Sequence, residues 1–342
     1  MRDDMVLTGM HGRSATREKM RRRPNALLNV MVWELRYCMA RRVNLIFFGE
    51  YVFFLLFYLV TKSQTDLNVF YYQPYRGVAV DAFSALGILM ASWLWILLLG
   101  LFQLLMVTDL VAHDLAARAH ELVMSTPTPT WAYIWGRYLA GVCIGLAMSL
   151  VMLIAVPLVG YAMHAGLPLG QYQDVSGYAQ LGYPAPDIGV IVGIWAMFVL
   201  PTIMLLTALG FVAGTLLPKY GNVLKLLLCA GWAAYMFVGT KVFELNSVTA
   251  NWELTTGALQ GVLVKQAQGV YHNSVNSGTS MLQRVHIVRG IEQQVPDMLP
   301  WILPHMLYSG IALLCVYYLA RSFQRFAGVT NGELPAATTC SI

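Results

Sequence analysis

The stretch TDLVAHDLAARAHELVMSTPTPTWAYIWGR, residues 108–137, is charged and lies between two long apolar runs at 83–107 and 139–160. Apolar runs of this length are sufficient to cross the ~30 Å hydrocarbon core of a bilayer as helices. The charged stretch is therefore predicted to connect two membrane spans at one surface of a membrane.

The composition of the whole chain is that of an integral membrane protein. Of its 342 residues, 58% are hydrophobic and 11% are charged, and the mean hydropathy is +0.59. These values are far from those of a soluble globular domain. We predict an all-α integral membrane protein with six transmembrane helices, at about 43–61, 83–107, 139–160, 188–216, 223–243 and 301–320.

The distribution of Lys and Arg predicts the orientation in the membrane. Sixteen of the 22 lie in residues 1–42, 108–137, 217–225 and 321–342, and six lie in the alternate loops, with Lys241 counted among these. Basic residues favour the cytoplasmic side. We therefore expect a multi-pass protein of the cell (plasma or inner) membrane with both termini in the cytoplasm. The first 24 residues are polar and basic, so we expect no cleaved signal peptide and a first span that remains as an anchor.

The N-terminal region, residues 1–42, is predicted to be a cytoplasmic basic arm followed by an interfacial helix. Leu28, Met31, Leu35 and Met39 form one helical stripe, with Glu34, Arg41 and Arg42 elsewhere. The alternative is a straight N-terminal extension of the first span. A basic arm beside a membrane explains the net charge of +5, so we expect membrane lipids and no nucleic acid as partners.

The charged stretch has the pattern of a short amphipathic helix outside the bilayer. Its apolar residues recur at helical spacing, and its charged residues lie on the opposite face. The apolar set is Val111, Leu115, Ala119 and Leu122, and the charged set is Asp114, Arg118 and Glu121. Pro127 and Pro129 prevent the helix from continuing. Aromatic residues then follow at the expected membrane boundary, at Trp131, Tyr133, Trp135 and Tyr138.

Several chemistries are excluded by spacing or by missing motifs. His113 and His120 are seven positions apart, about 10.5 Å along a helix, which is too far for one metal ion. The sequence has no CxxC pair, no GxxxxGK[ST] phosphate loop, no HExxH and no GxSxG. We therefore expect no metal site, no catalytic residues and no cofactor bound directly; if ATP is used, another chain binds it.

Glu50 is the one acidic residue well inside a predicted span. A carboxylate at that depth must be neutral, paired or beside water. It is either a contact for a substrate or proton, or a structural hydrogen-bonding group. The last outer loop, 244–300, is predicted to contain an amphipathic helix with Leu259, Val262, Leu263 and Val270 on one face, followed by a second through Met281, Val285 and Val288.

Taken together, these features resemble the permease subunit of an ABC-2 type transporter. They are six spans, cytoplasmic termini, an interfacial N-terminal helix, a long final outer loop and the run ELVMSTPTPTWAYIWGRYLAG at 121–141. The matching residues are Glu121, Leu122, Val123, Ser125, Thr126, Pro127, Gly136 and Arg137, which in that family form the coupling region received by the ATPase. Arg118 and Ala119 stand where the family often carries Gly-Thr.

The resemblance implies a transport subunit without ATPase motifs of its own, and therefore not an enzyme. It implies cytoplasmic ABC ATPase subunits that bind ATP and Mg, and a second permease copy or paralogue. The family is mostly exporters, so we expect export of a hydrophobic or amphipathic substrate. The residues expected to couple the chain to the ATPase are Asp114, Leu115, Arg118, Glu121, Leu122 and Pro127.

Two other classes of protein remain as alternatives. One is a structural or assembly membrane protein with no transport cycle, which ATP turnover by a reconstituted pair would exclude. The other is an integral membrane enzyme, which needs convergent polar groups at one depth. Glu50 and His305 lie at opposite predicted ends of their spans, which argues against a shared catalytic site.

Overall fold

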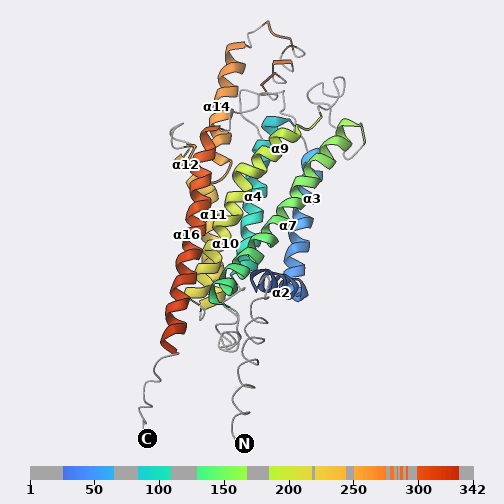
Figure 1. Cartoon of the computed structure of the whole chain (residues 1–342). Helices are drawn as coiled ribbons and strands as arrows, with labels where there is room; N and C mark the ends of the chain where they lie inside the picture. Colours follow the sequence, from blue (N-terminus) through green and yellow to red (C-terminus); the bar gives the residue numbers. More distant parts are fainter. Residues whose placement is uncertain are drawn as a thin grey trace, which may run out of the picture.

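The computed structural model of the chain is a bundle of long helices. It describes residues 26–64, 84–108, 129–167, 185–217, 220–243, 250–274, 278–280, 283, 286–287, 290–291 and 299–330. Within these residues the structure is almost entirely helical and has no strand, as the sequence predicts. Figure 1 shows the long helices side by side, with α2 and the C-terminal end of α16 at the same end of the bundle.

Five described helices are long and apolar enough to cross a membrane. They are α4 (Ala85–Val107), α7 (Thr130–His164), the run Ile188–Leu216, the run Gly221–Gly239, and Leu299–Ser322 within α16 (Leu299–Thr330). They coincide with the second to sixth predicted spans. The helix α3 (Arg42–Gln64) covers the first predicted span, 43–61, but is not one of the five. Its crossing of the membrane, and with it the total of six spans, stays a prediction.

Two helix boundaries differ from the predicted spans. The helix α7 begins at Thr130, so the aromatic residues read as a belt before span three form its first turns. Pro129 immediately precedes it, in an extended conformation, where a proline is well tolerated. The helix α16 continues to Thr330, past the predicted end at residue 320. Hydropathy locates the apolar centre of a helix, whereas backbone hydrogen bonding continues through polar residues beyond it.

Two of the long runs contain a π-helical turn. The run Ile188–Leu216 consists of α9 (Ile188–Ile194), η3 (Trp195–Val199) and α10 (Leu200–Leu216). Pro201, predicted to lie inside a span, is in the first turn of α10, just after η3, and leaves the helix continuous. The run Gly221–Gly239 consists of α11 (Gly221–Ala234) and η5 (Tyr235–Gly239), and α12 (Thr240–Phe243) continues it. Single π-helical turns are frequent at functional sites.

The helix α2 (Ala26–Ala40) lies crosswise at one end of the bundle (Figure 1). The chain turns at Arg41, and the Asn44 side chain donates a hydrogen bond of 3.2 Å to the carbonyl of Cys38. This turn shows that α2 is a separate helix and not a straight extension of α3. An interfacial placement of α2 is compatible with this direction.

The helix α4 is the most buried of the five apolar helices, and polar side chains join it to its neighbours. The Gln103 amide donates hydrogen bonds of 2.8 Å to the Gly141 carbonyl on α7 and to the Thr207 hydroxyl on α10. A Cβ at Gly145 would lie 2.7 Å from an Ile203 methyl group, and one at Gly214 would lie 2.6 Å from the Thr108 carbonyl oxygen. Small residues therefore let α4, α7 and α10 approach closely.

Candidate functional site

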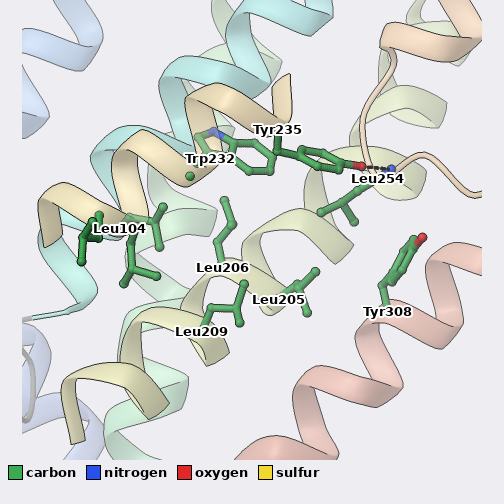
Figure 2. A pocket seen from close by; sticks show the side chains of 11 residues that line it. Leu104, Leu205, Leu206, Leu209, Trp232, Tyr235, Leu254 and Tyr308 are labelled. Carbon is green, nitrogen blue, oxygen red and sulfur yellow. Dashed lines mark hydrogen bonds between the residues drawn. The ribbon is translucent and has the colours of Figure 1, made fainter. Parts of the chain in front are cut away.

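A cavity of about 370 Å³ lies between α4, α10, α11 and α16 (Figure 2). This volume is within the range of small-molecule sites, and its lining is almost entirely apolar, as such sites usually are. The lining residues are Leu104, Leu205, Leu206, Leu209, Leu227, Leu228, Gly231, Trp232, Tyr235, Leu254 and Tyr308. We call it the leucine cavity.

The leucine cavity opens on the side of the bundle formed by α10 and α11. Leu209 is 46% exposed and Leu227 is 63% exposed, although both line the cavity. In contrast, Leu206 on its inner wall is buried. The apolar lining is therefore continuous from exposed leucines at the entrance to buried ones inside.

Two aromatic residues form one wall of the leucine cavity. The rings of Trp232 and Tyr235 are stacked, with centroids 5.7 Å apart and an interplanar angle of 19°. The Trp232 indole N–H donates to the Leu97 carbonyl at 3.1 Å. A Cβ at Gly100 would lie 2.2 Å from the indole nitrogen, so only glycine leaves room for this ring on α4. The wall is thereby fixed in both position and orientation.

Residues 250–258, which we call the strap, run into the first residues of α14 (Gly257–Ser274) and place Leu254 at one end of the cavity. The buried residues of the strap are Ala250, Glu253, Leu254, Thr255, Thr256 and Ala258. The Tyr235 hydroxyl accepts a hydrogen bond of 3.0 Å from the Leu254 N–H, which Figure 2 shows at the edge of the cavity. A π-helical turn and the strap thus meet at this end.

Side chains from three further elements hold the strap. The Ser92 hydroxyl on α4 donates to the Thr256 hydroxyl at 2.8 Å, and the Thr202 hydroxyl on α10 donates to the Leu254 carbonyl at 3.4 Å. The Tyr308 hydroxyl on α16 donates to the Trp252 carbonyl. Tyr235 and Tyr308 therefore both line the cavity and bind the strap.

Glu253 organises the strap from within. One oxygen of its carboxyl group accepts hydrogen bonds from the Thr255 N–H and hydroxyl, and the other accepts from the Ala258 N–H at 3.0 Å. These contacts satisfy backbone donors where α14 begins. Burial raises the pKa of Glu253, and the hydrogen bonds from Thr255 and Ala258 lower it in part. The carboxyl group therefore retains its proton to a higher pH than an exposed glutamate.

The predicted intramembrane polar residue, Glu50, does not face this cavity. It lies on an exposed side of α3 and is not among the lining residues. His305 is buried on α16, where its Nδ1 lies 2.8 Å from the Trp301 carbonyl and its ring packs against Phe198. The ring and hydrogen-bond contacts of the His305 side chain are with Phe198, Trp301 and Tyr308, and not with Glu50.

A second site, which unlike the cavity is polar, joins α2 to the first turns of α7. The Arg137 Nε lies 3.2 Å from a carboxylate oxygen of Glu34, and each side chain is 1% exposed. The Arg137 guanidinium also lies over the Tyr133 ring, 4.4 Å from its centroid. A Cβ at Gly136 would lie 2.8 Å from the Val30 side chain, so α2 and α7 touch closely. We call this contact the α2–α7 junction.

Sequence analysis missed the role of Glu34. The helical stripe of the predicted interfacial helix contains Leu28, Met31, Leu35 and Met39, of which Leu28 and Met39 are exposed, whereas Glu34 and Cys38 are the residues buried in the protein. The sequence did contain a signal for this pair, which was a lone acid inside one apolar helix and a lone arginine in a nearby apolar helix. Arg137 itself was singled out only as a residue matching the ABC-2 pattern.

The six residues expected to couple the chain to an ATPase lie outside the described residues. Asp114, Leu115, Arg118, Glu121, Leu122 and Pro127 fall within 109–128. The structure describes both flanks of this segment. Thr108 packs against Gly214 at the end of α10, and Pro129 leads into α7 and its junction with α2. Residues 109–128 therefore connect two helix ends that are both packed against neighbouring helices.

No group of three or more His, Cys, Asp and Glu side chains that could hold a metal ion occurs in the part of the chain that the structure describes. The four cysteines in that part, Cys38, Cys143, Cys229 and Cys315, are free thiols. Comparisons of the chain with protein-family models, with curated proteins and with solved structures found no match.

Proposed function

We propose that this chain is the membrane-spanning permease subunit of an ATP-binding cassette transporter of the ABC-2 type. It exports a hydrophobic or amphipathic molecule and is driven by a separate cytoplasmic ATPase that binds ATP and Mg. A second copy of the chain, or a related permease, completes the membrane unit. The proposal starts from the sequence resemblance, and two features of the structure support it.

The α2–α7 junction is the observation that carries the proposal. An ATPase outside the membrane can move membrane helices only through elements that are rigidly tied to them. Residues 109–128 lead directly into α7, whose first turns are fixed to α2 by the Glu34–Arg137 pair and the close approach at Gly136. A push on this segment is thereby transmitted to α7 and α2 together.

The leucine cavity supports an apolar or amphipathic substrate. Its leucines provide contact for a hydrocarbon group, and the hydroxyl groups of Tyr235 and Tyr308 lie at the end where the strap closes it. Aromatic side chains with one polar atom suit a ligand that is apolar at one end and polar at the other. The strap, held by hydrogen bonds, is the element that would have to move if the ligand leaves by that end.

The proposal is tested by purifying the tagged chain from its native membranes under mild conditions. We expect an ABC ATPase to co-purify and to hydrolyse ATP faster in proteoliposomes that contain the chain than in those that lack it. A membrane protein with a purely structural role would show neither result, and that outcome would exclude the proposal.

The role of the cavity is tested in the same preparation by mass spectrometry of bound small molecules. Leu205→Trp places a large ring in the leucine cavity, whereas Leu303→Trp places the same ring on an exposed position of α16 that does not line it. We expect a hydrophobic molecule to be retained by the wild type and Leu303→Trp and lost from Leu205→Trp. Equal retention of the molecule by both variants would show that the cavity is not part of the transport path.

A further inference from the structure

A second apolar depression lies on a different side of the bundle, between α3, α4 and α11. Its volume is about 460 Å³. Four residues of α4 line it, Phe54 borders it from α3, and α11 borders it on the other side. The lining residues are Phe54, Leu98, Leu101, Phe102, Leu105, Asn222, Lys225, Leu226 and Cys229. We call it the α3–α11 groove.

The polar residues of the groove all lie at one end. Asn222 and Lys225 are in the first two turns of α11, and Leu105 is in the last turn of α4. Further along, the Cys229 thiol lies 3.9 Å from the Leu101 carbonyl oxygen, and the Trp232 indole N–H donates to the Leu97 carbonyl, so the two helices run antiparallel and side by side. From Leu105 to Leu98 the apolar floor extends about 10 Å along the helix axis.

The polar end of the groove is the end of the bundle that carries α2 (Figure 1). Besides Lys225, this end carries Arg36 on α2, Arg41 at the turn and Arg42 at the start of α3. Basic residues at one membrane surface attract anionic lipids to that leaflet, by about 1 kcal/mol for each Lys or Arg near the surface. Anionic lipids are therefore enriched where the groove has its only basic lining residue.

We propose that the α3–α11 groove binds one anionic phospholipid from the leaflet at the α2 end. Its phosphate group lies against the Lys225 ammonium group and the Asn222 side-chain amide. One acyl chain lies along the floor formed by α4, between Phe54 and Leu226. The charge at the polar end of the groove is complementary to the phosphate group. The apolar floor that continues from it matches the acyl chain, so the two parts of the groove follow the same order as the two parts of the lipid.

This site is independent of the proposed transport function, because it requires only a lipid in equilibrium with the bilayer. The half-buried position of Lys225 strengthens its attraction for a phosphate group, since a charge beside apolar helices is screened less than one in open water. A zwitterionic lipid with the same acyl chains fits the floor equally well but carries no net negative charge for Lys225. Selectivity between the two lipids is therefore the property to measure.

The test uses the full-length chain in mixed micelles with phosphatidylglycerol and phosphatidylcholine of identical acyl chains, and native mass spectrometry counts the retained lipids. We expect wild type to retain one phosphatidylglycerol in preference to phosphatidylcholine. Lys225→Ala should bind it about fivefold more weakly, and Lys225→Arg should keep the preference. The matched control is Lys241→Ala, since Lys241 is an exposed lysine of α12, at the other end of the same helical run.

A second variant tests the acyl-chain part of the groove. Cys229→Phe adds a ring at the inner end of the floor and should reduce retention of both lipids, whereas Lys225→Ala reduces only that of the anionic one. The proposal is overturned if wild type shows no preference between the lipids. It is equally overturned if Lys225→Ala and Lys241→Ala weaken the binding of phosphatidylglycerol by the same factor. It is also overturned if cross-linking shows a second copy of this chain covering Lys225.

Discussion

The Arg137 guanidinium on α7 and the Glu34 carboxylate on α2 form an ion pair of 3.2 Å in which both side chains are buried. Burial of two charges carries a large desolvation penalty, which only good geometry and further polar contacts offset. The Tyr133 and Trp33 rings add cation–π contacts to the same guanidinium, with centroids at 4.4 and 5.9 Å. The ion pair and the two ring contacts together join α2 to the first turns of α7.

Removal of one partner of this pair should destabilise the protein strongly. Glu34→Ala leaves the Arg137 charge buried without its carboxylate, at an expected cost of about 3–5 kcal/mol in the free energy of unfolding. The measurement is unfolding by SDS in mixed micelles, followed by tryptophan fluorescence. The control is Arg36→Ala on the same helix, which removes an exposed charge and should change stability by less than about 0.5 kcal/mol.

The double variant Glu34→Leu/Arg137→Met distinguishes a buried-charge effect from a simple loss of volume. It removes both charges, so much of the stability lost in Glu34→Ala should return. If the double variant is as unstable as the sum of its two single variants, the ion pair contributes no coupling energy.

The close approach at the α2–α7 junction gives an independent prediction. A Cβ in Gly136→Ala would lie 2.8 Å from the Val30 side chain and 3.1 Å from the Leu27 carbonyl oxygen, so α2 must shift. We expect a loss of about 1–3 kcal/mol in the same unfolding experiment. Gly310→Ala is the matched control, because it meets no atom within 4 Å and should be neutral or slightly stabilising. Equal stability of the two variants would contradict the observed contact.

The apolar helices could be predicted from the sequence because each carries its own signal. The run Ile188–Leu216 coincides with its predicted span to the residue, although it contains a π-helical turn and Pro201. Length and hydropathy are properties of a single segment, and a segment that is long and apolar enough to cross the bilayer does so as a helix. The same reasoning overlooked the first turns of α7, which are formed by the aromatic residues read as a belt, and the last turns of α16, where polar residues continue the helix.

The candidate site could not be predicted, because its parts come together only in the folded bundle. Tyr235, Leu254 and Tyr308 meet at one end of the leucine cavity but belong to a π-helical turn, a loop and another helix. The strap was read only as the part of the outer loop 244–300 that precedes its first amphipathic helix. For Glu34, the stripe argument assumed that a charged residue faces water, whereas Arg137 provides a partner inside the protein. Long-range partners of this kind leave no periodic pattern.

The strap should loosen as the pH rises. Because burial raises the pKa of Glu253, the folded strap holds the proton more tightly than the unfolded chain does. The group therefore contributes stability that is complete below the carboxyl's ordinary pKa of about 4.3 and is lost as the pH rises through the raised value. Hydrogen exchange of residues 250–258, corrected for the intrinsic pH dependence, should show falling protection. Glu253→Gln does not titrate, so its protection should not vary with pH; a parallel fall in both proteins would contradict the role of Glu253.

Reversal of charge in the segment between α4 and α7 should uncouple the ATPase from this chain. We expect Arg118 and Glu121 to make contacts at the rim of the ATPase interface, so Arg118→Glu and Glu121→Lys place a repulsive charge there. Both variants should fold, because neither residue is needed for an apolar contact, but each should lose the stimulation of the co-purified ATPase. Arg321→Glu, at the exposed C-terminal part of α16, is the control and should keep it. Full stimulation in both 118 and 121 variants would show that this segment packs only on its own bundle and does not receive the ATPase.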